Sequence, residues 1–233
     1  MGGRAMTIPT GAGQAKRIPR LQVITDEMLQ TRLTHVEIAR LVVQGGADAV
    51  QYREKRALST RKLMAVASDI LGVCTGMHAQ LVVDDRVDVA CAVGAPAVHL
   101  GRNDLDVPTA RAILGAGAVI GGTANSYEEA RAVWSTGADY LGVGPIYGTR
   151  SKANPAPDMG LDTLARICRD SPVPIVAIGS ITAGRIPEVI AAGAYGVAVL
   201  SAVVSADDPA EATARCRAAL DAALASRSTE RRA

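Results

Sequence analysis

Short apolar runs rich in Val and Ile alternate, from Leu21 onward, with longer segments rich in Ala, Arg and Leu. This alternation is typical of repeated β-α units. The apolar runs are hydrophobic on both faces, as expected for parallel strands covered by helices. The expected strands are 21–26, 49–53, 80–85, 97–101, 119–124, 140–146, 175–181 and 196–201. Eight evenly spaced strands favour an α/β fold of one domain, the (β/α)8 or TIM barrel, with an open doubly wound sheet as the alternative.

A short motif recurs where each of several helices should end. It reads Gly-Gly-Ala-Asp-Ala-Val-Gln at 45–51, Gly-Ala-Pro-Ala-Val-His at 94–99, Gly-Ala-Asp-Tyr-Leu at 137–141 and Gly-Ala-Tyr-Gly-Val-Ala at 193–198. Gly at a helix end permits the left-handed backbone that turns the chain into the next strand. The motif therefore predicts a repeated αβ loop. We expect a flexible N-terminal extension at 1–19, a catalytic barrel at 20–225 and a flexible C-terminal tail at 226–233.

Composition narrows the class of protein. The 233 residues are 48% hydrophobic and 21% charged, which suits one continuous core. A net charge of +2, with no Phe and one Trp, argues against a nucleic-acid partner. No apolar run has the length of a signal peptide or a membrane span, so we expect a cytoplasmic protein with small-molecule partners, for which a homo-oligomer is left open. Four cysteines without a C-x-x-C pair indicate reduced, buried thiols.

The ends of the expected strands are unusually polar, and active sites of such barrels lie at the carboxyl ends of the strands. The polar segments are 51–55, 84–86, 99–104, 123–126, 144–152 and 179–182. Asp85 and Asp104 follow adjacent strands, which lie about 4.8 Å apart, so both carboxylates could bind one Mg²⁺. An equally weighted alternative makes Asp85 a helix cap and Asp104 a solvated loop acid. His99, inside the fourth strand, is expected to be a hydrogen-bonded barrel residue rather than a general base.

Cationic and hydroxyl groups at the same strand ends predict phosphate binding. Arg53 and Lys55 are alternate residues and share a face, where with Lys152 they could neutralise a diphosphate. The segment 149–152 could form a phosphate nest, although a Gly/Thr/Ser-rich loop is more often only a turn. Gly179 and Ser201 follow the seventh and eighth strands, the usual phosphate site of these barrels.

Five motifs in order give the span 21–204 a resemblance to the thiamine-phosphate synthase family. They are Gln-Tyr-Arg-Glu-Lys at 51–55, Asp-Asp-Arg-Val-Asp-Val-Ala at 84–90, Val-His-Leu-Gly-Arg-Asn-Asp at 98–104, Ala-Asp-Tyr-Leu-Gly-Val-Gly-Pro-Ile-Tyr-Gly-Thr-Arg-Ser-Lys at 138–152 and Val-Ala-Ile-Gly-Ser-Ile at 176–181. The resemblance implies an Mg²⁺-dependent transferase that joins 4-amino-2-methyl-5-hydroxymethylpyrimidine diphosphate to 4-methyl-5-(2-phosphoethyl)thiazole. Diphosphate leaves first, and the thiazole nitrogen captures the resulting cation.

The resemblance also implies a role for individual residues. Metal ligands fall on Asp85 and Asp104, and Arg53, Lys55 and Lys152 are the catalytic cations. Contacts to the pyrimidine diphosphate fall on Gln51, Tyr52, Arg53, Glu54, Lys55, Asp84, Thr123 and Lys152. Contacts to the thiazole phosphate fall on Thr149, Arg150, Ser151, Gly179, Leu200 and Ser201.

Three positions depart from the usual family pattern. Asp84 replaces an Asn and adds a negative charge, for which Arg86 or the metal is the expected screen, unless Asp84 binds the amino side of the pyrimidine. Thr123 replaces a Ser and keeps its hydroxyl. Ser180 replaces the second Gly of a pair and either narrows the thiazole-phosphate pocket or adds a donor to it.

Two rival functions are kept. A thiazole tautomerase of the same fold binds thiazole phosphate but needs neither the two acids nor the pair of Arg53 and Lys55. A non-catalytic, ligand-binding barrel would form no product.

Overall fold

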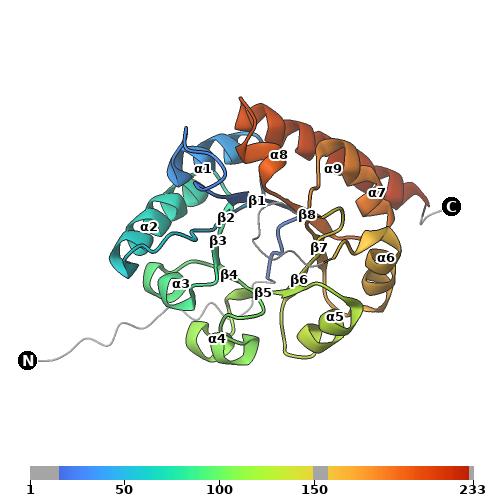
Figure 1. The fold of residues 1–233 in the computed structure, drawn as a ribbon, viewed down its shortest axis with the longest axis horizontal. Helices are drawn as coiled ribbons and strands as arrows, with labels where there is room; N and C mark the ends of the chain where they lie inside the picture. Colours follow the sequence, from blue (N-terminus) through green and yellow to red (C-terminus); the bar gives the residue numbers. More distant parts are fainter. Residues whose placement is uncertain (1–15, 149–156, 231–233) are drawn as a thin grey trace, which may run out of the picture.

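The computed structural model describes residues 16–148 and 157–230 and confirms the closed barrel. Eight parallel strands pair in the order β1 to β8, and β8 pairs with β1, so the sheet has no edge (Figure 1). The strands are β1 Leu21–Thr25, β2 Ala49–Tyr52, β3 Gln80–Asp84, β4 Ala97–Leu100, β5 Val119–Ala124, β6 Tyr140–Val143, β7 Ile175–Ala177 and β8 Gly196–Val199. Most end earlier than the apolar runs predict, because their last residues turn into the loops of the cavity.

Helices form a ring outside the strands (Figure 1). They are α1 His35–Gln44, α2 Thr60–Gly76, α3 Val87–Val93, α4 Val107–Leu114, α5 Tyr127–Trp134, α6 Gly160–Asp170, the short 3₁₀ helix η1 Ala183–Arg185, α7 Ile186–Ala191, α8 Ser201–Val204 and α9 Pro209–Glu230. Their apolar faces bury residues such as Ile38, Ile70 and Ile167 against the outer face of the sheet. The strands therefore need apolar side chains on both faces.

The inside of the barrel is filled by one side chain from each strand. These residues are Ile24, Ala49, Val82, Ala97, Val119, Tyr140, Val176 and Ala198. Seven of them are aliphatic, and the eighth, Tyr140, is the largest and is fully buried. Gly121 on the adjacent strand makes room for it, because a Cβ there would lie 2.2 Å from Cζ of Tyr140.

One step along the same inner face, the neighbouring strands β2, β3 and β4 carry polar side chains. Because side chains alternate along a strand, the residue two positions after each interior residue faces the same way. Ala49 is thus followed by Gln51, Val82 by Asp84 and Ala97 by His99, all of which line the cavity at the carboxyl ends. An apolar layer therefore closes the barrel directly beneath a polar mouth.

The Asp residues of the repeated αβ loop hold the starts of neighbouring strands. Asp48 accepts a hydrogen bond from the backbone N–H of Leu21 at 2.8 Å and donates its own N–H to the Leu21 carbonyl at 2.9 Å. Asp139 repeats this arrangement with Ile120, at 2.8 Å for both bonds. The motif Gly-Ala-Asp thus does more than turn the chain, since its carboxylate also fixes the next strand against its neighbour.

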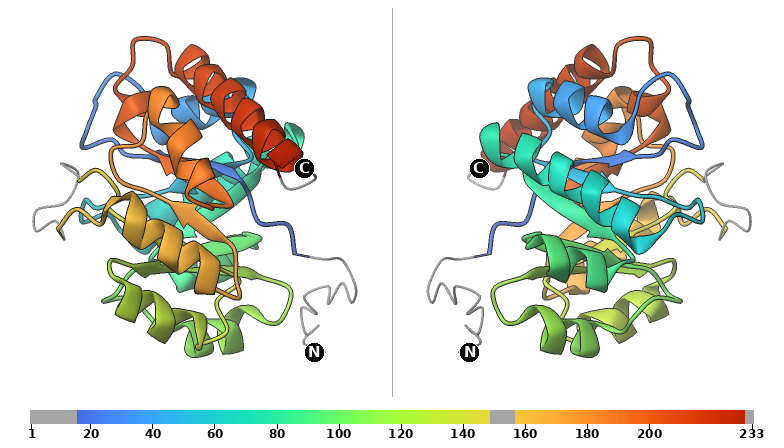
Figure 2. Two further views of the ribbon diagram at one scale, coloured as in Figure 1. Left: turned by 90° about the vertical axis from the view of Figure 1, so that its right-hand side faces the viewer. Right: turned by 90° about the vertical axis from the view of Figure 1, so that its left-hand side faces the viewer.

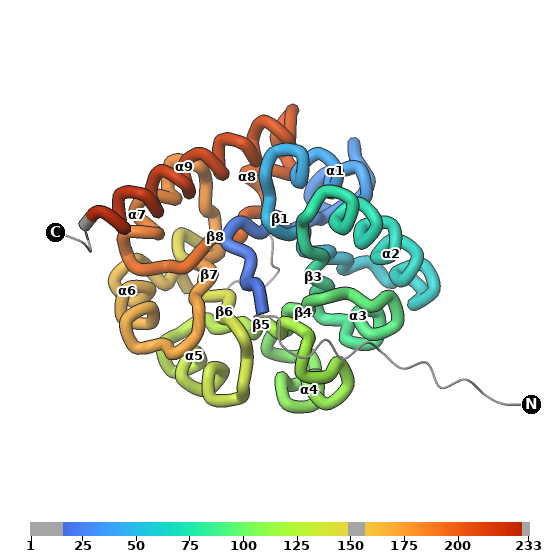
Figure 3. Tube along the Cα trace, turned by 180° about the vertical axis from the view of Figure 1, so that it is seen from behind, coloured from blue at the N-terminus to red at the C-terminus, as the bar shows by residue number. Residues whose placement is uncertain are grey.

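Both chain ends differ from the sequence-based boundaries. Residues 16–19, expected to be flexible, cross the amino-terminal end of the barrel (Figure 3), where Ile18 packs on the interior layer. Lys16 pairs with Asp139 at 2.7 Å. The helix α9 continues to Glu230, past the expected start of the C-terminal tail at 226 (Figure 2). Arg227 in this part donates to the carbonyls of Ile190 and Ala194, contacts that no local pattern shows.

Two further expectations concern the burial of the cysteines and membrane-spanning helices. Cys74 and Cys216 are buried as free thiols, but Cys91 is exposed and Cys168 is half-buried, so the prediction of four buried thiols is wrong for these two. Across 16–148 and 157–230, no helix combines the length and the apolar character needed to cross a lipid bilayer.

The carboxylate of Asp139 should stabilise the fold in a pH-dependent way. Burial alone would raise its pKa, but hydrogen bonds from Lys16, Ile120 and Arg111 outweigh burial and hold the pKa below its ordinary value. A lowered pKa means that the stabilisation is present above the unfolded-state pKa of about 3.9 and is lost as the pH falls below it.

We therefore expect Asp139→Asn to lower the free energy of unfolding by about 1–3 kcal/mol at pH 7, because hydrogen bonds to a charged group are lost. The difference should shrink as the pH falls below about 3.9. Urea denaturation at pH 7 and pH 3 measures both values. Asp207→Asn is the control, because its fully exposed carboxylate lies 3.8 Å from Arg32 and should change neither value. A deficit for Asp139→Asn that is equal at both pH values would contradict the assignment.

Candidate active site

A cavity of about 1360 Å³ opens at the carboxyl ends of the strands. Ten of the predicted site residues line it, and they come from strands or loops around most of the barrel. They are Gln51, Arg53, Lys55, Asp84, Asp85, Asp104, Thr123, Gly179, Leu200 and Ser201. Thr149, Arg150, Ser151 and Lys152 lie outside the described residues.

The segment after β2 brings two cations into this cavity. Arg53 pairs with Asp26, and its Nε lies 3.9 Å from Oδ2 of Asp84. Lys55 pairs with Asp85, and its Nζ lies 3.4 Å from the same Asp84 oxygen. Burial alone would lower the pKa of Lys55, but the neighbouring Asp84 and Asp85 outweigh burial and raise it. Both cations are therefore charged and balanced by carboxylates.

Asp85 and Asp104 converge from the loops after β3 and β4. Asp85 has a left-handed backbone, with φ of 63°, and its N–H donates to the His99 carbonyl at 2.9 Å. Asp104 accepts the N–H of Gly101 at 2.7 Å. Burial alone would raise the pKa of Asp85, but hydrogen bonds from Asp104 and Lys55 outweigh burial and lower it. Burial and the neighbouring Asp85 carboxylate raise the pKa of Asp104.

The alternative role of helix cap does not fit the position of Asp85. The residue before α3 is Arg86, and no side chain caps this helix, so Asp85 is not a helix cap. Asp104 does lie in a loop, but it is half-buried and its carboxylate accepts the N–H of Gly101. Two hard oxygen donors thus meet at one point of the cavity wall, a donor set that suits Mg²⁺.

The negative charge of Asp84 is screened by residues other than the expected Arg86. Arg86 turns away and contacts Asp88 and Thr60, so it does not screen Asp84. Lys55 and Arg53 do so from the cavity side. Burial and the neighbouring Asp85 raise the pKa of Asp84, and the two cations oppose that rise. The extra negative charge is therefore matched by the cations that a diphosphate would also contact.

His99 is a hydrogen-bonded barrel residue, as predicted. One ring nitrogen lies 3.1 Å from the hydroxyl of Tyr140 and the other 2.9 Å from that of Thr123. Gly142 leaves space for the ring, because a Cβ there would lie 2.8 Å from Cε1 of His99. With both nitrogens engaged, His99 is placed to orient the Thr123 hydroxyl at the cavity wall.

Two of the residues predicted to contact substrate do not line the cavity. Tyr52 and Glu54 alternate with the inward residues and point out of the barrel, and neither lines the cavity. Tyr52 belongs to the core between strands and helices, with its ring edge against His35 at a centroid distance of 4.8 Å. Glu54 contacts His35 and Arg56 instead. The motif 51–55 predicts one continuous set of substrate contacts. Strand alternation instead directs Gln51, Arg53 and Lys55 into the cavity and the two residues between them outward.

Sequence reasoning also missed residues that the fold brings to the cavity. Asn125 donates to the carbonyl of Gly144, and the guanidinium of Arg166 lies 3.7 Å from the ring centroid of Tyr127. Asn125 lies within the polar segment 123–126, which pointed to it without a role. Arg166 is in the middle of α6, and only helix packing places it at the cavity.

Known proteins of similar sequence and structure agree on one family. Residues 21–203 match the family described as thiamine monophosphate synthase. The thiamine-phosphate synthase of Salinibacter ruber is 46% identical over 209 residues, which are 90% of this chain and 92% of that protein. That of Methanospirillum hungatei is 42% identical over 83% of this chain and 93% of its own. The thiamine phosphate pyrophosphorylase structure from Pyrococcus furiosus superposes with a TM-score of 0.81, at 38% identity, covering 88% of this chain and 96% of that one.

The chain belongs to the thiamine-phosphate synthase family. It is a transferase of thiamine biosynthesis, which confirms the activity implied by the five motifs. A 3-hexulose-6-phosphate synthase, at 20% identity and a TM-score of 0.63, shares the fold.

The departure from the family pattern at Ser180 lies where the loops after β6 and β7 meet. Ile146 and Tyr147 donate backbone N–H groups to the carbonyls of Ile178 and Gly179, at 2.9 and 3.3 Å. Ser180 extends this pairing, because its hydroxyl donates to the Gly148 carbonyl at 2.9 Å. The added side chain therefore acts as a donor to the neighbouring loop. It does so at a φ of 49°, a left-handed conformation that costs energy for Ser but not for Gly.

Two variants separate the hydrogen bond of Ser180 from its backbone conformation. Ser180→Ala loses the hydroxyl and keeps the unfavourable φ, so we expect the free energy of unfolding to fall by about 1 kcal/mol. Ser180→Gly loses the same bond but relieves the φ, so it should be more stable than the Ala variant by about 1 kcal/mol. Chemical denaturation of both proteins measures the order. A Gly variant less stable than the Ala variant would show that the backbone is not strained at this position.

Proposed function

We propose that the chain joins 4-amino-2-methyl-5-hydroxymethylpyrimidine diphosphate to 4-methyl-5-(2-phosphoethyl)thiazole and releases diphosphate. The observation that supports this most is the meeting of two cations, Arg53 and Lys55, with two carboxylates, Asp85 and Asp104, in one cavity. A diphosphate with a bound divalent cation matches this mixture of charges, because the diphosphate would contact the two cations and the metal would contact the two carboxylates. A thiazole tautomerase would have no use for it.

Mg²⁺ is the proposed cofactor, with Asp85 and Asp104 as its protein ligands. When bound, it would neutralise negative charge on the departing diphosphate. The contact between the two carboxyl groups supports this assignment, since placing two acids together is unfavourable without a cation. Lys55 would then exchange its contact with Asp85 for a diphosphate oxygen.

The protein's own contribution is charge stabilisation and alignment. Arg53 and Lys55, with Lys152, bind the outer diphosphate oxygens, each charge-assisted hydrogen bond contributing about 1.5–3 kcal/mol. Departure of diphosphate leaves a cation that the amino group of the pyrimidine delocalises, so no protein nucleophile is required. Gln51 and Thr123, on the inner wall, hold the pyrimidine.

The thiazole phosphate is proposed to bind on the opposite side of the mouth. Gly179, Leu200 and Ser201 line the cavity after β7 and β8, and Ser201 begins the short helix α8. Barrels of this class commonly bind phosphate at such a helix. A Cβ at Gly179 would lie 2.5 Å from Cα of Pro145, so only Gly lets the two loops approach. The thiazole nitrogen would then face the pyrimidine methylene across the cavity.

We also propose a cytoplasmic location and small-molecule partners alone, without nucleic acid or membrane. A homo-oligomer remains a prediction.

Product formation tests the proposed function directly. With both substrates and Mg²⁺, the purified chain should form thiamine phosphate and diphosphate in equal amounts, detected by chromatography. Synthesis should stop after chelation and return when Mg²⁺ is restored. A tautomerase or a binding protein would form no thiamine phosphate, and synthesis that persists after complete chelation would remove Mg²⁺ from the proposal.

Asp85→Asn should lower kcat/KM for the pyrimidine diphosphate by about one to two orders of magnitude, since a charged contact of about 1.5–3 kcal/mol is lost. The Mg²⁺ concentration needed for half-maximal rate should rise. Steady-state kinetics at varied Mg²⁺ measures both effects. Asp88→Asn is the matched control, because Asp88 is an exposed acid that pairs with Arg86 outside the cavity. Equal rates and equal Mg²⁺ requirements for Asp85→Asn and the control would show that Asp85 is not a ligand.

A further inference from the structure

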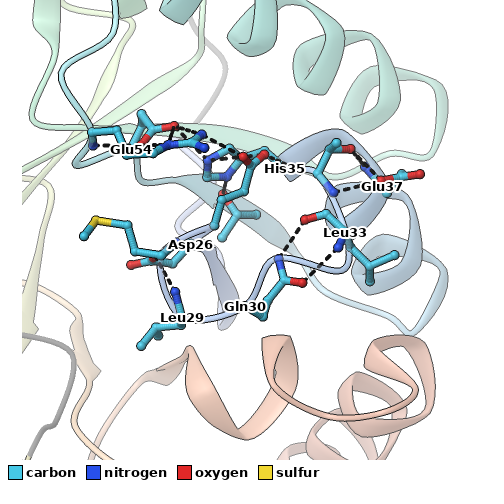
Figure 4. Close-up of polar contacts among 12 residues, drawn as sticks. Asp26, Leu29, Gln30, Leu33, His35, Glu37 and Glu54 are labelled. Carbon is cyan, nitrogen blue, oxygen red and sulfur yellow. Dashed lines mark hydrogen bonds and ion pairs between the residues drawn. The ribbon is translucent and has the colours of Figure 1, made fainter.

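The segment after β2 presents opposite chemistry on its two sides. Arg53 and Lys55 face the cavity, whereas Glu54 faces the loop between β1 and α1. Figure 4 shows Glu54 beside His35. Because neighbouring residues of an extended chain point in opposite directions, the side on which Glu54 is held decides the side on which both cations lie.

Glu54 is held by a set of contacts that a solvated acid would lack. One of its oxygens accepts both the backbone N–H and the Nε–H of Arg56, at 2.9 Å each. The other lies 3.4 Å from Nε2 of His35. The Glu54 side chain is only 3% exposed. Burial alone would raise its pKa, but the hydrogen bonds from Arg56 outweigh burial and lower the pKa to about 2, so this buried acid is ionised.

The partners of Glu54 are themselves fixed to the barrel. His35 is the first residue of α1, and its Nδ1 lies 2.7 Å from the hydroxyl of Thr25 at the end of β1. Glu27 accepts the N–H of His35 at 2.8 Å and contacts the Arg56 guanidinium at 2.7 Å. Glu54 is thus tied to β1 and α1, two elements of the rigid scaffold.

This cluster is organised around Arg56. Glu27, His35 and Glu54 each offer a ligand atom within 4.8 Å of the others, which is close enough for a metal ion. The guanidinium of Arg56 already contacts both carboxylates and provides the positive charge between them. We therefore interpret these contacts as an anchor for the segment 53–56 and not as a metal site.

We propose that Glu54 is a positioning residue: by anchoring the segment after β2 to His35 and Arg56, it holds Arg53 and Lys55 in the orientation that binds the diphosphate group. The proposal rests on the proposed function of those two cations. Glu54 touches no substrate, and its effect is selective for the substrate whose diphosphate they bind. The thiazole-phosphate side, formed after β7 and β8, belongs to a different part of the barrel.

Glu54→Gln is the direct test, because it keeps the shape of the side chain and removes the charge that holds Arg56 and His35. In the full chain with Mg²⁺, we expect KM for the pyrimidine diphosphate to rise about tenfold and KM for the thiazole phosphate to change less than about twofold. The affinity for inorganic diphosphate, measured by calorimetry, should fall about tenfold in parallel.

The control must destabilise the same region without touching the segment 53–56. Glu37→Ala does this, because Glu37 accepts the N–H of Thr34 at 2.8 Å in the capping box of α1 and lies on the surface. It should lower the melting temperature and leave both KM values and the affinity for diphosphate unchanged. Equal affinity for diphosphate in Glu54→Gln and wild type, or parallel changes in both KM values, would overturn the positioning role.

If Glu54→Gln does not fold, Arg56→Gln replaces it in the test. This variant removes the exposed guanidinium that contacts Glu54, and it should cause the same selective loss of affinity for diphosphate. Retained diphosphate affinity in that variant would equally overturn the proposal. Failure of the proposed function is distinguishable, because wild type would then form no thiamine phosphate at all. Wild-type synthesis with an unaffected Glu54→Gln would reject only the role of Glu54.

Discussion

The structure depends on the alternation of side chains along eight parallel strands. One residue of each strand packs in the barrel interior, and on six of the strands the next residue on the same face lines the cavity. The apolar layer supplies burial that holds the strands together, and it also forms the floor that excludes water from below the site. Tyr140 joins the two levels, because its ring belongs to the floor and its hydroxyl contacts His99 in the polar mouth.

Charge balance is the second organising constraint. Arg53 is largely buried and Lys55 partly so, and the charge of each is balanced by the carboxylates of Asp26, Asp84 and Asp85 beside them. The cations can still bind substrate, because the negative oxygens of a diphosphate can replace these carboxylates beside them. On the outer side, Glu54 and Arg56 form a separate balanced group. Alternation keeps the two groups apart although their residues are adjacent in sequence.

Much of the fold and the site was predictable from local patterns. Apolar runs at regular spacing predicted the strands, because parallel strands need burial on both faces, and Gly-Ala-Asp predicted the αβ loops. Polar residues at strand ends predicted Asp85, Asp104, Arg53 and Lys55, because the carboxyl ends of all strands meet at one mouth. The side that Tyr52 and Glu54 take was not predictable, since a motif names residues without saying which face each one occupies.

The sequence alone indicated three features: the barrel fold, the family, and the end of the barrel that carries the site. Each is encoded in short-range spacing and composition. Only the tertiary structure decided which partners the charges have. Arg86 turns to Asp88, Arg166 reaches the cavity from α6, and Ser180 donates to Gly148. The helix α9 continues to Glu230, and its Arg227 donates to the carbonyls of Ile190 and Ala194. These contacts join residues far apart in the chain or choose one of several reachable partners. Their geometry is set by helix and loop packing, which no local pattern records.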